Sequence, residues 1–433
     1  MTNTPLKGIR VVDFTVAGAG PAAGKMLADW GADVIKIEPL DGENGRFTGL
    51  TLGMRADEEQ NPHEELKDGN KRGIPLNLKD PRGMEVMDKL LATANIFISN
   101  YRLKALTKLG LDYEAMSARH PHIIWGILTG FGTEGPVANN PGFDTVAFWA
   151  RSGAMIDLCE NGAVPLTPPF ALGDFGTAGT LAGACAACLL QQAKTGKGEK
   201  VMVSLYGQAI WDNAAIMQAE YHGNHWPKTR LDPDSPLRNT YQCKDGTWMM
   251  ISVLNYERYY ASFCKVVGRE DLVNDERFNT EVNMRSHKAE LMEILDPIFL
   301  TKDYAEWDAL LTEGDIAHDR INHIRDTIRD EQALANNYVY EYENRDGTKD
   351  LIVSTPVKFG QPDQIAHRNA PPAGRALRGT DARAGLQRRR NRRLGGGGRR
   401  PYPLSRVYFC GPPSILDFFH RGTTEKEGCL WKS

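Results

Sequence analysis

Five short apolar segments, separated by stretches of chain that suit helices, constrain the fold of this sequence more than any other feature. They cover residues 9–14, 34–37, 96–99, 123–128 and 200–204. Each is long enough for a buried strand and shorter than an ordinary helix. Strands of this kind that alternate with helices indicate a parallel sheet with helices on both faces. We therefore expect an α/β fold.

Helical patterns occupy the gaps between these strands. We predict helices over 22–30, 80–94, 176–194 and 205–220, and a helix or turn over 101–109. Asp80 and Pro81 open the second helix, because proline is tolerated in a first turn. Gly196 closes the long Ala- and Leu-rich third helix. Residues 74–78 form a further apparent strand.

The pattern changes near residue 225. Asp245 and Gly246 predict a hairpin turn within 241–252. Helical segments follow over 256–268, 286–300 and 304–313, and a second hairpin turn at 346–347 leads to the apolar residues 351–353. We predict a large domain over 1–224 and a smaller α+β domain over 225–335.

The charge distribution sets the last part of the chain apart. The formal net charge is −3, yet residues 361–433 hold 15 Lys and Arg against 5 Asp and Glu. The rest of the chain is acidic, so we expect no nucleic-acid partner for it. Three interpretations stay open for the tail with its Arg-rich run 387–393: an arm for a nucleic acid or an acidic partner, a segment without fixed structure, or an ending foreign to the fold.

We expect neither a metal site nor a membrane segment. The seven cysteines and ten histidines show no zinc spacing, and Cys185 and Cys188 are typical of buried structural residues. The odd cysteine count fits a reducing compartment. The longest weakly polar stretch, 177–190, falls short of the ~20 residues that span a bilayer, and the first residues lack the apolar core of a signal peptide. We expect a cytoplasmic protein.

Glycines between the first strand and the first helix form the first candidate site. Gly18, Gly20 and Gly24 resemble a dinucleotide fingerprint, but the last glycine falls one place late and Pro21 interrupts it. A nicotinamide-dependent oxidoreductase is therefore the weaker alternative. Small residues at a helix start still let a phosphate approach backbone N–H groups.

Two basic clusters form the second candidate. One contains Lys71 and Arg72, and the other contains Arg102, Lys104 and Lys108. They are either solvated surface charge or a site for a phosphorylated ligand.

Asp174 is the third candidate. It follows Gly173 and starts a helix of small and apolar residues. As an N-cap it has a structural role, which Asp favours. In a glycine-lined pocket its carboxylate is instead a covalent nucleophile for an acyl group.

Together and in this order, these segments resemble the class III (CaiB/BaiF-type) CoA-transferases. The resemblance covers about residues 5–371, and it is carried by 6–14, 20–21, 26–38, 69–72, 142–144, 173–174 and 194–199. Within the family, 65–71, 141–144 and 235–246 are most similar to members that act on 2-hydroxy acids, such as 2-hydroxyisocaproate and phenyllactate.

The resemblance implies a fold and an activity. It implies a Rossmann-like large domain to which residues 336–371 return, a smaller domain, and an interlocked homodimer. It implies that CoA moves from an acyl-CoA donor to a carboxylic acid, with Asp174 as nucleophile and with Asp144 and Gly173 in support. It implies an aspartyl anhydride and an aspartyl-CoA thioester, without a bound cofactor or metal. The residues that it places at CoA are Gly18, Ala19, Lys71, Arg72, Asn100, Tyr101 and Lys108.

Several alternatives remain within the superfamily. Carnitine and bile acids are the other acceptors that we consider. The α-methylacyl-CoA racemases have a histidine where Phe143 stands, and without that base racemisation loses half of its proton transfer. Arg46 is the nearest replacement for basic residues that some members carry after the position of Glu38. Four aromatic residues are assigned to the core rather than to an acyl pocket: Phe143, Phe148, Trp149 and Tyr206.

The resemblance stops near Pro371. The sudden enrichment in Arg, Gly and Pro that follows is typical of a GC-rich gene read out of frame. We hypothesise a frameshift at about 360–372, which would make residues 372–433 an aberrant tail.

Overall fold

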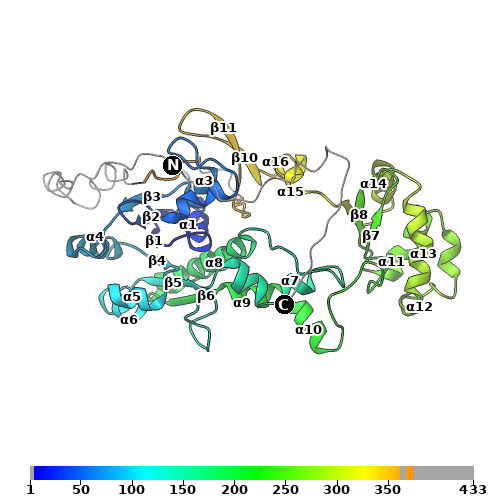
Figure 1. Cartoon of the computed structure of the whole chain (residues 1–433), viewed down its shortest axis with the longest axis horizontal. Coiled ribbons are helices and arrows are strands. Elements are labelled where there is room, and N and C mark those ends of the chain that lie inside the picture. The colour runs from blue at the N-terminus through cyan, green and yellow to red at the C-terminus, as the bar shows by residue number, and fades with distance from the viewer. Residues whose placement is uncertain (1–3, 361–366, 374–433) are drawn as a thin grey trace, which may run out of the picture. The chain divides into compact units, whose positions relative to one another are not determined.

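The apolar segments of the N-terminal half form one parallel sheet. The computed structural model describes residues 4–360 and 367–373, and within them six strands pair in the order β3-β2-β1-β4-β5-β6 (Figure 1). The strands are β1 (Arg10–Phe14), β2 (Asp33–Glu38), β3 (Arg72–Pro75), β4 (Ile96–Ser99), β5 (Ile124–Thr129) and β6 (Lys200–Ser204). This is the strand order of the Rossmann fold. The α/β prediction is confirmed, and the tail from residue 374 lies outside the described residues.

Alternate residues of these strands face two separate hydrophobic layers. Val11, Ile96 and Ile98 pack under α1 (Ala19–Asp29) and α8 (Leu172–Thr195). Their neighbours Val12 and Phe97 pack on the other face. The helices on that face are α4 (Pro81–Leu91), α5 (Leu103–Leu109) and α6 (Tyr113–Arg119). The two-residue period of a strand therefore gives the sheet its two helical layers.

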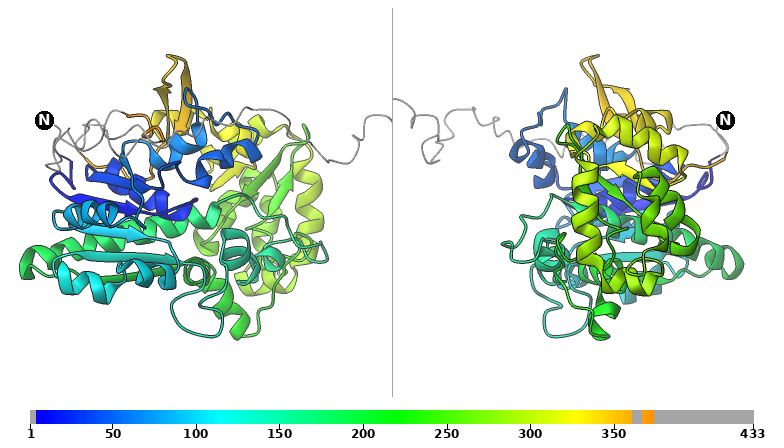
Figure 2. Two further views of the ribbon diagram at one scale, coloured as in Figure 1. Left: turned by 60° about the vertical axis from the view of Figure 1, so that its left-hand side comes forward. Right: turned by 90° about the vertical axis from the view of Figure 1, so that its right-hand side faces the viewer.

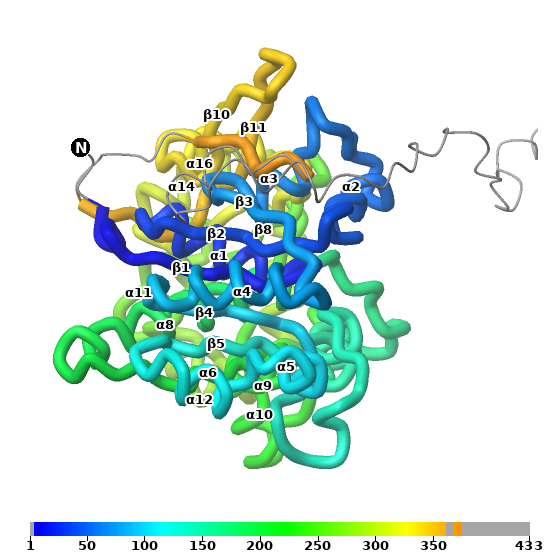
Figure 3. The backbone as a smooth tube through the Cα atoms, turned by 90° about the vertical axis from the view of Figure 1, so that its left-hand side faces the viewer, coloured from blue at the N-terminus to red at the C-terminus, as the bar shows by residue number. Residues whose placement is uncertain are grey.

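The strand order reverses between β1 and β4, which lie side by side in Figure 3. In open α/β sheets, ligands bind beyond the carboxyl ends of the strands at this reversal. Here the segment 15–18 follows β1 and residues 100–101 follow β4. The fold thus selects these two loops as the place for a site.

Residues 225–335 carry a core of their own. Three strands pair in the order β7-β8-β9, and the helices around them bury the side chains of Tyr241, Phe263, Phe299 and Trp307. The elements are β7 (Thr240–Gln242), β8 (Trp248–Ile251), α11 (Tyr256–Val266), η3 (Glu270–Asn274), α12 (Glu281–Ser286), α13 (Lys288–Phe299), α14 (Tyr304–Glu313), β9 (His318–Arg320), α15 (Ile324–Thr327) and α16 (Glu331–Ala335). The first predicted hairpin and the three predicted helices are confirmed.

The chain then returns to its N-terminal half. The hairpin of β10 (Val339–Glu343) and β11 (Lys349–Val353) lies against α3 (Pro62–Asp68), as Figure 2 shows. Beyond it, the Asn70 amide donates to the Arg368 carbonyl at 2.8 Å. The Ala370 amide donates to the Glu65 carboxylate at 2.7 Å. Residues 367–371 are therefore fixed on the segment around β3.

Several helical segments differ from the predictions. Helix α1 begins at Ala19, so that Gly20 and Pro21 lie in the helix and not in a turn before it. The predicted helix 205–220 is divided at Asn213 into α9 (Leu205–Asp212) and α10 (Ala214–Tyr221). The sequence pattern also missed the π-helix η2 (Asp144–Ala150), together with the short η1 (Asn44–Phe47), α2 (Thr48–Thr51) and α7 (Ala154–Asp157).

Helix α8, at Leu172–Thr195, is longer than the helix predicted over 176–194. By length and composition alone it is the one helix in the described residues that would cross a membrane, and a third of its apolar window is buried. Its buried residues, among them Leu181 and Cys185, pack in the core beside α1. The core helix of a globular protein meets the same criteria, so this feature alone does not indicate a membrane protein.

Glycines let α1 approach its neighbours closely. A methyl group at Gly24 would overlap the Asp13 carboxylate and lie 2.9 Å from Nζ of Lys71. One at Gly20 would lie 2.6 Å from Cβ of Thr15. These glycines serve the packing of α1 against β1 and β3, which is a different use from a dinucleotide fingerprint.

We predict that Gly24→Ala lowers the free energy of unfolding by about 3 kcal/mol, because its methyl group displaces a buried ion pair. The matched control is Gly183→Ala on α8, where a methyl group meets no atom within 4 Å. It should raise stability by up to about 1 kcal/mol through helix propensity. Urea unfolding of both variants measures the difference, and equal stabilities would contradict the packing argument.

Candidate active site

Asp174 lies in the first turn of α8, where its carboxylate meets the start of α1. The cap residue of α8 is Ala171, which adopts a left-handed conformation with φ of 61°. Asp174 therefore stands three residues inside the helix and is not its N-cap. A methyl group at Gly18 would overlap Oδ2 of Asp174. Only a glycine at this position lets the two helix starts come so close.

The start of α1 offers free donors next to this carboxylate. Gly18 is the cap residue, and the first helical bond runs from the Ala22 amide to the Gly18 carbonyl at 3.0 Å. The amides of Ala19 and Gly20 precede that bond, so they have no acceptor within the helix. Together with the helix dipole, they favour negative charge at this place.

The Asp144 side chain caps the first turn of α8, which the cap residue Ala171 does not do. Ala171 makes no side-chain cap bond, but the Asp174 amide donates to Oδ1 of Asp144 at 3.1 Å. Asp144 is the first residue of η2, and it is buried. A methyl group at Gly173 would overlap this same oxygen and the ring of Phe148. Asp144 and Gly173 thus hold Asp174 from the side of α8, and the Asp174 amide is not free for an oxyanion.

Burial raises the pKa of Asp174 to about 7, and the negative charge of Asp144 adds to this shift. Burial also raises the pKa of Asp144. A carboxyl group with a pKa near neutrality is typical of functional sites, because a structural acid is usually paired or solvated.

The loop between β1 and α1 is held from two sides. On one side, Asn100 accepts from the Val16 amide at 2.8 Å and donates to the Val16 carbonyl at 2.7 Å. On the other side, Glu43 accepts from the Ala17 amide at 2.9 Å. Tyr101 stacks on Phe14, the last residue of β1, with 4.3 Å between ring centroids. The structure therefore brings Gly18, Ala19, Asn100 and Tyr101 together with Asp174 at the strand reversal.

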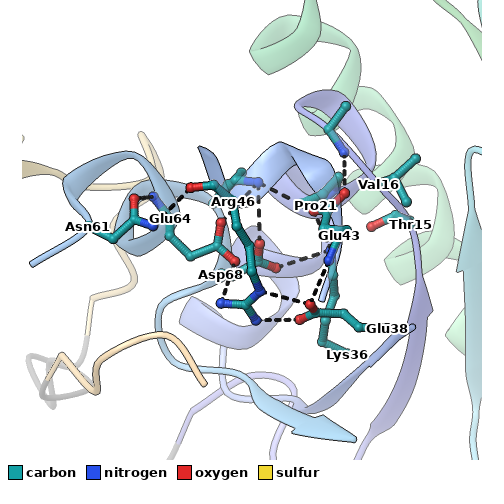
Figure 4. A network of polar contacts seen from close by, with 12 residues as sticks. Thr15, Val16, Pro21, Lys36, Glu38, Glu43, Arg46, Asn61, Glu64 and Asp68 are labelled. Atoms are coloured by element: carbon teal, nitrogen blue, oxygen red, sulfur yellow. Dashed lines mark hydrogen bonds and ion pairs between the residues drawn. The ribbon is translucent and has the colours of Figure 1, made fainter. Parts of the chain in front are cut away.

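Lys71 lies elsewhere, in a buried cluster of charges; Figure 4 shows other members of this cluster, among them Lys36, Glu43 and Asp68. Its Nζ donates to Asp13 at 2.7 Å, to Asp68 at 2.6 Å and to the Pro21 carbonyl at 2.7 Å. An ammonium group has three donors, and all three are used here. Such a side chain has none left for a phosphate, so we assign Lys71 to the interior and not to CoA.

The same cluster contains further ion pairs, which we call the buried ion network. Its members are Asp13, Lys36, Glu38, Glu43, Arg46, Glu64, Lys67, Asp68 and Lys71. Burial alone would lower the pKa of Lys36, but the carboxylates of Asp68, Asp13 and Glu43 raise it above its usual range. Arg46 forms a bidentate pair with Glu38, at 2.8 and 2.5 Å, and so does not replace a solvent-facing base.

Arg72 points to the opposite end of the sheet. Its guanidinium forms a bidentate pair with Asp33, the first residue of β2, at 2.7 and 2.6 Å. Asp174 and the loop 15–18 lie beyond the carboxyl ends of the strands. The predicted contact between Arg72 and CoA therefore does not fit its position.

The second basic cluster is exposed. Arg102 is the cap residue of α5, and Lys104 and Lys108 lie one turn apart within that helix. No acidic residue of the described chain forms an ion pair with these three. They remain available to a phosphorylated ligand near Tyr101.

The aromatic assignments are mostly confirmed. Phe148 and Trp149 are buried, and Tyr206 is half-buried. Phe143 is 66% exposed, so its assignment to the core is wrong. It immediately precedes η2, and the residue that is buried there is Asp144.

Glu43 is the contact of this site that sequence reasoning missed. Nothing in the spacing of a single acidic residue indicates that it accepts a bond from Ala17, which lies 26 positions earlier. Among the residues that the structure describes, no cluster of His, Cys, Asp or Glu has the geometry of a metal site.

Known proteins match this chain over most of its length. The model of CoA-transferase family III matches residues 6–376. The (R)-2-hydroxy-4-methylpentanoate CoA-transferase of Clostridioides difficile is 38% identical over 369 residues, which cover 85% of this chain and 92% of that protein. The cinnamoyl-CoA:phenyllactate CoA-transferase of Clostridium sporogenes is 35% identical over 368 residues, which cover 84% of this chain and 89% of that protein.

A solved structure shares the fold. The crystal structure of a CaiB/BaiF family protein from Brucella suis matches with a TM-score of 0.73 at 27% identity. The match covers 89% of this chain and 100% of that one.

We predict that Asp174→Asn stabilises the fold at alkaline pH. The folded pKa near 7 lies above the unfolded value, so ionisation of Asp174 costs stability increasingly as pH rises between the two values. At about pH 8 the variant should gain a few kcal/mol, at about 1.4 kcal/mol per pKa unit, and clearly less at about pH 5. Thermal unfolding measures this.

Asp41→Asn is the control, because Asp41 is exposed. It should leave the unfolding temperature unchanged at both pH values. A gain for Asp174→Asn that does not depend on pH would refute the raised pKa.

Proposed function

The chain belongs to CoA-transferase family III, and we propose that it moves CoA from an acyl-CoA donor to a 2-hydroxy acid with an apolar side chain, using Asp174 as nucleophile. One observation carries the role of Asp174: its half-buried carboxylate, with a pKa raised to about 7, lies against the start of α1. The acceptor class rests on the relatives that transfer CoA to 2-hydroxy-4-methylpentanoate and phenyllactate.

In the first half of the proposed reaction, Asp174 attacks the carbonyl carbon of the donor thioester. The C–S bond breaks, which gives a mixed anhydride of Asp174 and the donor acid and releases the CoA thiolate. The thiolate then attacks the Asp174 carbonyl carbon. The anhydride C–O bond breaks, the donor carboxylate leaves, and Asp174 carries CoA as a thioester.

The second half repeats these steps in reverse with the acceptor. Its carboxylate attacks the aspartyl thioester and displaces the thiolate, which gives a second mixed anhydride. The thiolate attacks the acceptor carbonyl carbon, and Asp174 leaves as a carboxylate. Each step exchanges acyl groups, so no proton, electron or phosphate is consumed.

The start of α1 fits the charge that develops in these steps. Each attack forms a tetrahedral oxyanion next to Asp174, where the amides of Ala19 and Gly20 have no helical acceptor. Preorganised amides of this kind stabilise oxyanions more than the ground-state carbonyl. The Asn100 and Tyr101 side chains fix the loop and the strand end around them.

A homodimer is part of the proposal. Helix α10 is apolar but buries none of its residues, and its Tyr221 is 85% exposed; Trp211, near the end of α9, is 75% exposed. Exposed apolar surface of this extent is typical of an interface. The interlocked form expected from the family resemblance would cover it.

We predict that the purified chain forms new CoA thioesters when it is mixed with an acyl-CoA and a panel of carboxylic acids. Branched and aromatic 2-hydroxy acids should be accepted before carnitine and bile acids. The rate should rise with pH toward about 7, because only the ionised Asp174 attacks. Mass spectrometry identifies each product.

Asp174→Asn is the control for this assay and should abolish transfer. Transfer that survives in this variant would refute the nucleophile. Transfer to carnitine or bile acids alone would refute the acceptor class.

We predict that Lys108→Glu raises the KM for the acyl-CoA donor about three- to tenfold at low salt, through lost attraction to the phosphates. An acyl-pantetheine donor, which lacks those phosphates, should show no change. The control is Lys197→Glu, an exposed lysine that precedes the amino end of β6 and so lies at the end of the strands away from Asp174. An equal effect on both donors would contradict a phosphate contact.

A further inference from the structure

Glu43 lies buried between β2 and η1, and the two oxygens of its carboxylate contact different parts of the structure. Oε2 accepts from the Ala17 amide at 2.9 Å. Oε1 faces the ammonium groups of Lys67, at 3.3 Å, and Lys36, at 3.5 Å. One oxygen therefore belongs to the loop beside Asp174, and the other belongs to the buried ion network.

The loop that Glu43 contacts adopts a conformation that it would not hold alone. Ala17 has a φ of 66°, in the left-handed region that residues with a Cβ rarely adopt. Such backbone conformations persist only where the surroundings impose them, and they concentrate at functional sites. Glu43 and Asn100 impose this one, by bonds to Ala17 and to Val16.

The next residue in the chain is the one that meets Asp174. Gly18 lies so close to the Asp174 carboxylate that a methyl group would overlap it. A rotation of the backbone at Ala17 therefore shifts Gly18 and the first amides of α1 relative to the reacting carboxylate. Misplacement by about 1 Å from a distant change can reduce an enzymatic rate about a hundredfold.

The network keeps Glu43 in place. Lys67 also pairs with Glu64 at 3.0 Å, and Lys36 also pairs with Asp68 at 3.5 Å. The Glu43 amide donates to Glu38 at 3.3 Å. Figure 4 shows Glu43 between Val16 of the loop and the charged side chains of Lys36 and Glu38. The carboxylate thus has a fixed position from which it holds the Ala17 amide.

We propose that Glu43 is a positioning residue for CoA transfer, which sets the start of α1 against Asp174 through the Ala17 amide. This inference rests on the proposed function. It assigns to Glu43 a geometric role, in which an acceptor oxygen at the reach of a glutamate side chain is essential and the negative charge is secondary.

Two substitutions separate these properties. Glu43→Gln removes the charge but keeps an oxygen at the same reach. Glu43→Asp keeps the charge but withdraws the oxygen from Ala17 by one methylene group. We expect Glu43→Asp to lower kcat about tenfold or more with little change in the KM for acyl-CoA, and Glu43→Gln to keep most of kcat.

The matched control is Glu64→Gln, which removes a carboxylate from the same network without a contact to the loop. Its kcat should stay within about twofold of the native value. Hydrogen–deuterium exchange of the peptide that contains Ala17 gives a readout independent of catalysis. Exchange of that amide should accelerate in Glu43→Asp and remain near native in Glu43→Gln and Glu64→Gln.

The outcomes are distinguishable. A kcat that is lower in Glu43→Gln than in Glu43→Asp would show that the charge matters more than the reach, and it would overturn the proposal. Unchanged exchange of the Ala17 amide in Glu43→Asp would also overturn it. If the native chain transfers no CoA, the proposed function fails, and the positional role falls with it even where the exchange data show the loop bond.

Discussion

The contact between Gly18 and the Asp174 carboxylate is the point at which the sheet, the two central helices and the β1–α1 loop meet. Helices α1 and α8 pack against each other over the same face of the sheet. Their first turns come together only because no side chain stands at Gly18. The strand reversal between β1 and β4 supplies the place. Many folds of this type bind ligands at the strand reversal; in this chain the close approach of Gly18 and Asp174 places a carboxylate there.

The buried ion network supports the loop beside Asp174, although burying its charges costs free energy of desolvation. Taking an ion out of water costs several kcal/mol, and mutual attraction repays this only where each charge has more than one good partner. The structure meets that condition: Lys71 pairs with two carboxylates and Lys67 contacts three. Burial and the charge of Asp68 raise the pKa of Glu64 to about 7, which reduces the excess of negative charge near neutrality. What such a network provides is a defined arrangement of β1, β2, α3 and η1, and this is the arrangement that the loop at Ala17 needs.

Prediction from sequence succeeded where the signal is local and failed where the partner is distant. Apolar runs gave the strands, because that pattern lies within a few neighbouring residues. The glycine-flanked Asp174 left an N-cap and a nucleophile open; the structure excludes the N-cap, and the nucleophile stays a prediction. Lys71 and Arg72 have the same appearance in the sequence as any basic pair. Lys71 pairs with Asp68, three positions away, but also with Asp13, 58 positions away. The partner of Arg72, Asp33, lies 39 positions away, so only the fold shows that both cations are occupied. Glu43 was not identified for the same reason, since its partner Ala17 lies 26 positions earlier. Phe143 was wrongly assigned to the core, because in the π-helix that follows it Asp144 is the buried residue.

The starts of α1 and α8 differ in whether a side chain caps them, and Asp144 makes this difference. It accepts from the first turn of α8, which begins at an alanine without a cap of its own. In doing so it places a second carboxylate near Asp174, whose pKa it raises further. The start of α1 has no such cap, so its amides stay free. Under the proposed mechanism, the Asp144 carboxylate that caps α8 makes the ionised Asp174 less stable. The free amides at the start of α1 then stabilise the negative charge on the oxyanion. The two effects both favour the attack of Asp174 on a carbonyl carbon, and both require that the loop at Ala17 hold α1 where it is.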